Sequence, residues 1–293
     1  MVCNTIREII VHADQEFGTH DAIRYKVKKD LVEAKSYRQL KQDSESFSCV
    51  LKALGEQGSH IALTGMTSYP WIVTYFGTVN SGSVAVPLDV SLPAEEMCEL
   101  IDRADATVFV ADEVRKDVLA IVKERCPKLK YVISMQQEAS TDDMLSFSQL
   151  LKEHAGSFDH WANPEALCTI MFTSGTTGKS KGVMLTQRNL AENATCLDMK
   201  IPSRTVILSV LPIHHAYCLS MDILKGISLG SIICINDSLI RVAKNIKLFE
   251  PNMILMVPLM IETLAKKLEE AAGLPPAIVK KEVDPASRGA AAE

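Results

Sequence analysis

The 293-residue chain lacks an apolar run long enough to cross a membrane. Its longest apolar tract, residues 206–235, is interrupted by Pro212, Asp222 and Lys225 as well as two histidines, whereas a spanning helix needs roughly 20 predominantly apolar residues. The N-terminus has charges within its first dozen residues and no apolar core of a signal peptide. We therefore expect no transmembrane segment and a cytoplasmic location. The hydrophobic content of 47% is ordinary for a globular protein with a large core.

An excess of positive charge is also missing. The chain has 31 basic and 36 acidic residues, a formal net charge of −5. Nucleic-acid binding usually needs a basic face, so this balance disfavours a nucleic-acid partner. An acidic protein that binds an anionic nucleotide must concentrate positive charge locally, and Lys179, Lys181 and Arg188 lie close together in the sequence.

The eight cysteines form no pair with CxxC spacing, and most lie inside apolar runs such as "SIICI". A disulfide framework is not expected at this length, and the spacing of a zinc site is absent. We expect no metal site and interpret the cysteines as small buried apolar residues in a reducing compartment.

Short β-branched runs alternate with amphipathic stretches from about residue 57 onward. Strands are predicted at 60–65, 83–89, 107–112 and 131–135, with helices at 69–82, 93–105 and 113–125. After a polar connection at 136–146, the pattern predicts strands at 167–172, 181–186, 205–211, 231–235 and 252–258, and helices at 187–199, between 211 and 231, at 239–249 and at 258–272.

Repeated strand–helix units with nearly continuous apolar strands indicate an α/β fold, with two mainly parallel sheets flanked by helices. We expect the sheets to divide near the 136–166 connection. This gives a first α/β subdomain at 1–145 and a second, incomplete one at 146–283. Residues 284–293 have no periodicity, and both a disordered terminus and foreign residues remain open for this tail.

The stretch TSGTTGKSKG, residues 173–182, has the composition of a phosphate-binding loop. It is not a Walker P-loop, because Thr173 stands where that pattern needs its first glycine and an apolar, strand-like run follows the lysine. A solvated hairpin turn is the plain alternative. Glycines that allow a tight backbone, hydroxyl donors and two lysines favour an anion site instead. The candidate phosphate-binding residues are Thr173, Ser174, Gly175, Thr176, Thr177, Gly178, Lys179 and Lys181.

Four stretches, in order, resemble motifs of the adenylate-forming enzymes, the superfamily of acyl-CoA synthetases, peptide-synthetase adenylation domains and beetle luciferases. "MFTSGTTGKSKGVMLTQRNL" is similar to their phosphate-binding signature, although Ser180 stands where the family usually has proline. The other three are "SYRQL" (36–40), "VNSGSVAVPLDVSLPAEE" (79–96) and "LPIHHAY" (211–217). The resemblance implies the N-terminal part of that family's large domain and looks closest to long-chain fatty acid–CoA ligases.

The resemblance implies a ligase that joins a fatty acid to CoA through an acyl-adenylate, with ATP, Mg²⁺ and CoA as cofactors of the whole enzyme. The loop from Thr173 to Lys181 would hold the β- and γ-phosphates. His215 would lie beside the acyl carboxylate, although a packed core histidine is the alternative. His214 is a candidate for the pocket wall only.

The family's Tyr-Gly-x-Thr-Glu segment, its ribose-binding Asp and its C-terminal lysine are not found in this sequence. We therefore expect a fragment of an acyl-CoA synthetase that is inactive by itself, with self-association through surface that truncation exposes. Two alternatives stay open. One is a naturally short, non-catalytic nucleotide- or acyl-binding paralogue, and the other is an enzyme that adenylates amino or aryl acids.

Overall fold

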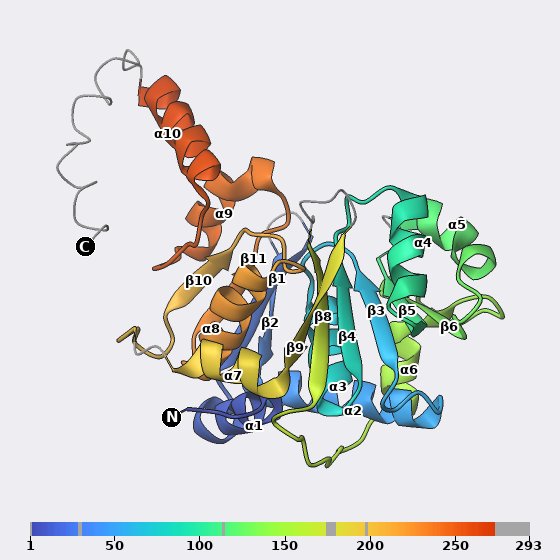
Figure 1. Ribbon diagram of the computed structural model, residues 1–293. Coiled ribbons are helices and arrows are strands. Elements are labelled where there is room, and N and C mark those ends of the chain that lie inside the picture. Colours follow the sequence, from blue (N-terminus) through green and yellow to red (C-terminus); the bar gives the residue numbers. More distant parts are fainter. Residues whose placement is uncertain (1, 29–30, 113–114, 174–179, 197–198, 273–293) are drawn as a thin grey trace. The chain divides into compact units, whose positions relative to one another are not determined.

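Two β-sheets organise the chain, whose computed structural model describes residues 2–28, 31–112, 115–173, 180–196 and 199–272 (Figure 1). The larger sheet has seven strands, all parallel except the last pair, β8 and β9. Its strand order is β7 (Leu145–Ser146), β6 (Tyr131–Ser134), β5 (Ala106–Ala111), β3 (His60–Thr64), β4 (Val84–Leu88), β8 (Leu167–Thr173) and β9 (Lys181–Thr186).

The smaller sheet has four strands, with β10, β11 and β1 parallel and β2 antiparallel at the edge. Its strand order is β10 (Val206–Ser209), β11 (Ile232–Ile235), β1 (Asp21–Lys28) and β2 (Leu31–Ser36). The expected α/β class with two mainly parallel sheets is confirmed.

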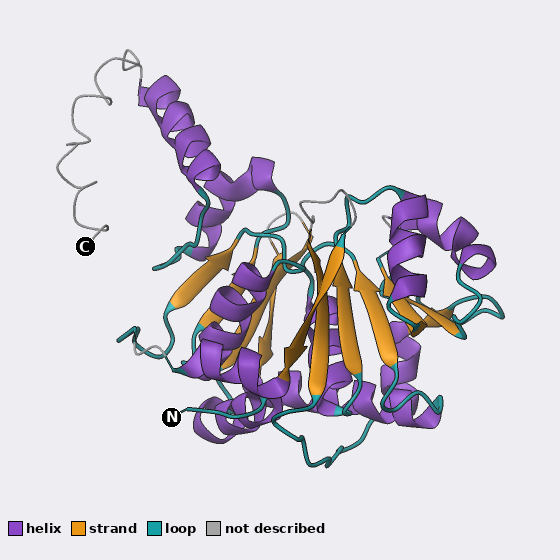
Figure 2. Ribbon diagram, viewed as in Figure 1, coloured by secondary structure: helices purple, strands orange, loops and turns teal. Residues whose placement is uncertain are grey.

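Helices pack against the strands of both sheets (Figure 2). In residues 2–254 they are α1 (Ile6–Phe17), α2 (Tyr37–Ala53), α3 (Tyr69–Asn80), α4 (Ala94–Arg103), α5 (Lys116–Arg125), α6 (Phe147–Glu153), α7 (Gln187–Thr195), the π-helix η2 (Cys218–Leu224), α8 (Lys225–Ser228), the short 3₁₀-helix η3 (Leu239–Arg241) and α9 (Val242–Phe249). Met1–Ile254 form one compact unit, and Leu255–Glu293 form a second, whose described part holds α10 (Pro258–Ala272).

Helix α3 is the most deeply buried helix of the first unit and shows why the sequence folds as it does. Ser68 caps the first turn of α3 by accepting a hydrogen bond from the Trp71 amide, and the aromatic side chains of the helix are buried. Gly77 lets α2 approach closely, because a Cβ there would lie 2.7 Å from the Cβ of Phe47. The Ser48 hydroxyl then donates to the Gly77 carbonyl at 2.7 Å.

The expectation that the sheets divide near 136–166 is wrong. Strands β8 and β9, which follow that connection, extend the sheet that β3 to β7 begin, and β10 and β11 join the sheet of β1 and β2. Pairing between strands far apart in the chain is a tertiary property that local periodicity does not carry. The subdomain ranges 1–145 and 146–283 stay a prediction, and strands on the two sides of that boundary share both sheets.

The strand predicted at 252–258 is also wrong over most of its length. Only an isolated parallel bridge joins Met253 to Ile207. Glu250 ends α9 in a left-handed conformation, and the amides of Asn252 and Met253 both donate to the Val206 carbonyl. Because both amides use one acceptor, the regular ladder of a strand does not continue.

No helix among the described residues is both long enough and apolar enough to cross a bilayer.

Candidate functional site

The carboxyl ends of four parallel strands, two from each sheet, border a cavity of about 270 Å³. Ligands of open α/β sheets bind at this edge, because loops there are free to vary while the strands fix their positions. The residues that directly follow the strands line it: Gly65 after β3, Asp89 after β4, Val210 after β10 and Asn236 after β11.

One wall of the cavity is the segment Leu211–Tyr217, here called the histidine loop. Within it, the His215 amide donates to the Pro212 carbonyl at 3.1 Å, which forms a tight turn. The ring centroids of His214 and His215 are 4.3 Å apart, and both side chains line the cavity. His214 is largely buried, with its side chain 8% exposed, whereas His215 is exposed.

His214 lies opposite Asp89, with 3.6 Å between His214 Nε2 and Asp89 Oδ1. Burial lowers the pKa of His214 to about 4, against the opposing pull of Asp89. The imidazole is therefore neutral at pH 7, and a distance of 3.6 Å is too long for a hydrogen bond. The contact is a close polar approach between the two sheets, and His214 Nε2 has no hydrogen-bond partner among the described residues.

Asp89 is ionised at neutral pH. Burial opposes its charge, but the amide and the hydroxyl of Ser91 both donate to Asp89 Oδ1, at 2.8 and 2.7 Å, and hold the carboxyl pKa below its usual value. The cavity therefore presents a carboxylate and a neutral imidazole side by side. The sequence reasoning did not identify Asp89, and its place directly after a buried parallel strand was the available signal.

The predicted phosphate loop begins at the same edge of the larger sheet. Strand β8 runs parallel to β4, and Thr173 is its last residue. Strand β9 returns antiparallel from Lys181, whose Cα pairs with that of Thr173, so the two described ends of the loop face each other. The remaining candidates Ser174, Gly175, Thr176, Thr177, Gly178 and Lys179 lie outside the described residues.

The segment after the loop excludes the Walker alternative. A Walker P-loop delivers its lysine into a helix, whereas residues Lys181–Thr186 form a strand. A hairpin holds anions through backbone amides, hydroxyls and lysines rather than through a helix N-terminus. Both Thr173 and Lys181 are exposed and available to such a ligand.

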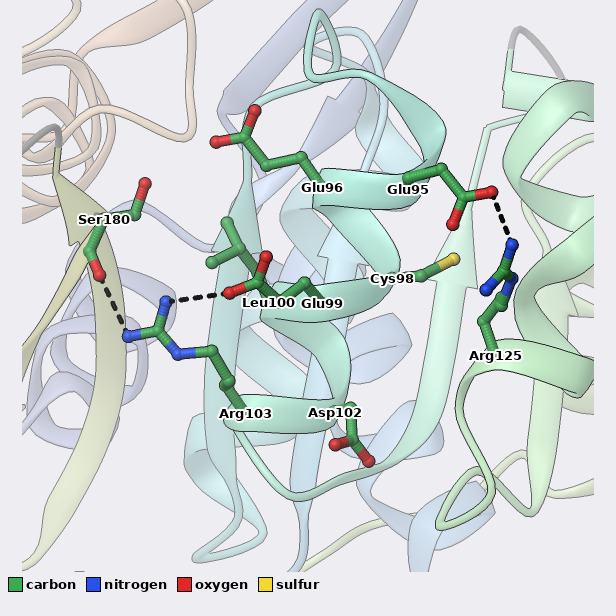
Figure 3. A pocket seen from close by; sticks show the side chains of 9 residues that line it. All are labelled: Glu95, Glu96, Cys98, Glu99, Leu100, Asp102, Arg103, Arg125 and Ser180. Carbon is green, nitrogen blue, oxygen red and sulfur yellow. Dashed lines mark hydrogen bonds and ion pairs between the residues drawn. The ribbon is translucent and has the colours of Figure 1, made fainter. Parts of the chain in front are cut away.

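Arg103 of α4 contacts one residue before the loop and one near its end, and Figure 3 shows its hydrogen bond to Ser180. Its Nη2 donates to the Ser180 carbonyl at 3.0 Å, and its guanidinium carbon lies 5.7 Å from the ring centroid of Phe172. Phe172 precedes the loop and Ser180 ends it, so one side chain touches both flanks. Sequence reasoning missed Arg103, which only its place in the last turn of a helix could have suggested.

The larger cavity in Figure 3, about 700 Å³, lies along α4 next to Ser180. Its lining includes four carboxylates and two arginines, and each arginine is already paired, Arg103 with Glu99 at 3.7 Å and Arg125 with Glu95 at 3.0 Å. This acidic surface repels a polyphosphate. A polyphosphate is therefore not expected in this cavity.

No group of three or more His, Cys, Asp or Glu side chains in the described part of the chain could hold a metal ion.

A comparison with protein families shows which family the chain belongs to. The family of AMP-binding enzymes matches residues 12–285, nearly the whole chain. The chain belongs to the AMP-binding enzyme family. Its motifs at 36–40, 79–96, 171–190 and 211–217 all fall inside or across that match, and the resemblance deduced from the sequence is confirmed.

Among AMP-binding enzymes, curated relatives of this chain include long-chain fatty acid–CoA ligases. ACSBG1 of Mus musculus is 25% identical, with 92% of this chain and 40% of the relative covered. Long-chain-fatty-acid–CoA ligase 5 of Rattus norvegicus is 29% identical, covering 82% of this chain and 38% of the relative. The chain thus spans about 40% of the length of these relatives.

Among solved structures, the N-terminal domain of FACL13 from Mycobacterium tuberculosis matches with a TM-score of 0.81 and 20% identity. The match covers 92% of this chain and 67% of that structure. It shows that the fold is that of the N-terminal domain of an adenylate-forming enzyme.

Proposed function

We propose that this chain is the N-terminal portion of an ATP-dependent carboxylate–CoA ligase that acts on fatty acids. In the whole protein, the carboxylate of the acid attacks the α-phosphate of ATP, which gives acyl-adenylate and pyrophosphate. The CoA thiol then displaces AMP and forms the thioester. ATP, Mg²⁺ and CoA are the cofactors that this reaction requires.

One observation carries the proposal: the cavity with His214 and His215 opens at the sheet edge where β8 leads into the phosphate loop. An acid in the cavity and a nucleotide on the loop would meet at a shared edge. Bringing a weak nucleophile and a polyanion together in a fixed orientation is the main physical demand of acid adenylation. We infer fatty acids as the class of acid because the similar relatives are named long-chain fatty acid–CoA ligases.

The roles of the residues follow from their positions. His215 lines the cavity and donates a hydrogen bond to the acid carboxylate. The Lys181 ammonium neutralises charge on the β- and γ-phosphates, and Thr173 and the loop between them donate hydrogen bonds to these phosphates. Arg103 fixes the flanks of the loop so that these donors stay in place. The printed sequence holds no Tyr-Gly-x-Thr-Glu segment, so we infer that this chain alone does not turn over.

Asp89 favours a second candidate, an acid that carries an amino group. The ionised carboxylate of Asp89 lines the cavity, and an ammonium group would pair with it where a plain alkyl chain would not. Under this alternative the chain belongs to an enzyme that adenylates amino or aminoaryl acids. Both candidates use the same histidine loop and phosphate loop.

Ligand binding to the purified chain distinguishes the candidates. Isothermal titration in the presence of ATP would compare decanoate with phenylalanine and with anthranilate. Fatty-acid binding that His215→Ala weakens supports the proposal, and preferential binding of an amino acid that Asp89→Asn abolishes supports the alternative. Fatty-acid-dependent AMP release by this chain alone contradicts its predicted inactivity.

A further inference from the structure

The thiol of Cys218 contacts the residues at the start of the histidine loop. Cys218 begins η2 directly after the loop, and its Sγ lies 3.2 Å from the carbonyl oxygen of Leu211, the first residue of the loop. The same sulfur lies 3.6 Å from the hydroxyl of Ser209, the last residue of β10. The thiol therefore joins the end of the strand to the start of the helix and fixes both ends of the loop.

A fully buried carboxyl group lies on the other side of this thiol. Asp222, one turn along η2, has 3.8 Å between its Oδ2 and Cys218 Sγ. Its Oδ1 has no hydrogen-bond partner in the part of the chain that the structure describes, and the side chain is 0% exposed. A buried carboxylate without full hydrogen bonding is costly, so such a group tends to hold a proton. π-helical turns within helices occur often at functional sites.

The thiol has a single hydrogen, and besides the Ser209 hydroxyl two oxygen acceptors lie near it. Burial raises the pKa of the Cys218 thiol to about 12, so it stays protonated at neutral pH. Both the Leu211 carbonyl and the Asp222 carboxyl lie within its reach. A charged acceptor forms the stronger hydrogen bond. Ionisation of Asp222 therefore moves the thiol's hydrogen bond from the Leu211 carbonyl to the Asp222 carboxylate.

We propose that Asp222 is a positioning residue whose protonation state selects the acceptor of the Cys218 thiol and thereby sets the position of the histidine loop. With Asp222 protonated, the thiol donates to the Leu211 carbonyl and the base of the loop is closed. With Asp222 ionised, its proton has gone to solvent, the thiol turns to the carboxylate and the Leu211 carbonyl loses its donor. His214 and His215 move with the loop in either case.

The charged groups around Asp222 leave it responsive near neutral pH. Burial raises its pKa to about 6, while the Ser209 hydroxyl of β10 and the Cys218 thiol act in the opposite direction. From α8, the buried Lys225 directs its ammonium to the Ala194 carbonyl of α7 at 3.0 Å.

Helix α7 also packs against η2. Its charged residues Arg188 and Glu192 form an ion pair with each other at 3.2 Å. Among the groups that shift the pKa of Asp222, none is a charged residue of α7 or α8. Within the described residues, the titration of Asp222 therefore acts on the Cys218 thiol and the Ser209 hydroxyl.

Carbon-13 NMR of the ligand-free chain tests the proposal directly. The Asp222 carboxyl and Leu211 carbonyl resonances would be followed from pH 4.5 to pH 8. We expect both to shift with one shared inflection, near pH 6. In Asp222→Asn, the Leu211 inflection is lost.

Cys218→Ala separates the thiol from the carboxyl group. In this variant, Asp222 still titrates but the Leu211 resonance no longer follows it. Cys234→Ala is the matched control, because Cys234 is an equally buried cysteine on β11, outside the loop, and the inflection must persist there. A Leu211 resonance that stays flat in the unmodified chain, or that keeps its inflection in either Asp222→Asn or Cys218→Ala, overturns the proposal.

The consequence for ligands rests on the proposed function. Acid affinity should change across the same pH interval in the unmodified chain and lose that part of its pH dependence in Cys218→Ala. The NMR result requires no ligand, so a failure of acid binding would count against the proposed function and leave the loop mechanism standing.

Discussion

His214 Nε2 and Asp89 Oδ1 lie 3.6 Å apart, and this contact joins the histidine loop after β10 to the end of β4. The two residues belong to different sheets, so the contact marks where the two carboxyl edges meet around the cavity. Because His214 is neutral at pH 7, the pair is not a salt bridge under ordinary conditions.

Because His214 is buried in its neutral state, we predict that the folding stability of the chain falls at acidic pH. Its pKa falls from the usual 6.5 to about 4 on folding, so the unfolded chain binds a proton first as the pH drops. The stability that the buried neutral ring contributes is complete above pH 6.5 and is lost between pH 6.5 and 4. The loss amounts to about 3 kcal/mol at most.

Urea unfolding of His214→Gln at several pH values checks this prediction. The variant should lose less stability than the unmodified chain between pH 6.5 and 4.5. Identical pH profiles for the two proteins would show that His214 does not titrate as described.

For Asp222 we predict the opposite dependence of folding stability on pH. Its pKa rises from 3.8 to about 6 on folding, so the folded chain keeps a proton that the unfolded chain releases. The stability linked to this proton is full below pH 3.8 and is lost as the pH rises through 6, by roughly 3 kcal/mol. Asp222→Asn removes the buried charge, so it should stabilise the chain at pH 8 relative to its effect at pH 4.5. Paired urea titrations measure this difference, and an equal effect of the substitution at both pH values contradicts it.

The contacts of Arg103 lead us to predict that this residue of α4 contributes to ATP affinity. Arg103→Ala removes the donor to the Ser180 carbonyl and the contact with Phe172. We expect ATP affinity to fall about tenfold, the equivalent of one lost charge-assisted hydrogen bond. Arg103→Lys should recover only part of it, because lysine lacks the planar fork.

Arg125→Ala is the matched control for this experiment. Arg125 lines the same cavity and pairs with Glu95, but it does not touch Ser180 in Figure 3. Isothermal titration with ATP should give the unmodified affinity for this control. If both substitutions lowered ATP affinity equally, the effect would come from the charge of the cavity and not from the contacts of Arg103 with Ser180 and Phe172.

Much of the fold could be predicted because its strands are nearly continuous apolar runs. Strands β3 to β6 and β8 lie within a residue or two of their predicted ranges, since parallel strands inside a sheet are buried on both faces. Strand β9, an exposed antiparallel edge strand, was also predicted at its observed range. No elements were predicted before residue 57, where α1, β1, β2 and α2 lie. Strands β1 and β2 are only partly buried and lack that pattern. A helix was predicted between β10 and β11, but its π-helical turn was not.

The candidate site was predictable only where a motif marks it. The phosphate loop and His215 came from ordered motifs. Thr173 ends β8, Lys181 begins β9, and His215 lines the cavity in the loop that follows β10; their roles stay predictions. Asp89, Arg103 and Asp222 were missed for one shared reason. Each gains its role from a partner distant in the sequence or from burial, and neither is visible before the chain is folded.

The most direct test of the account is to find where the acid binds. A fatty acid with a diazirine beside its carboxylate would be photo-crosslinked to the chain in the presence of ATP, and the modified peptide identified by mass spectrometry. The account predicts modification of the histidine loop, Leu211–Tyr217, or of the facing segment at 89–91, with the yield reduced in His215→Ala. Modification confined to the cavity along α4, or labelling that His215→Ala leaves unchanged, would contradict it.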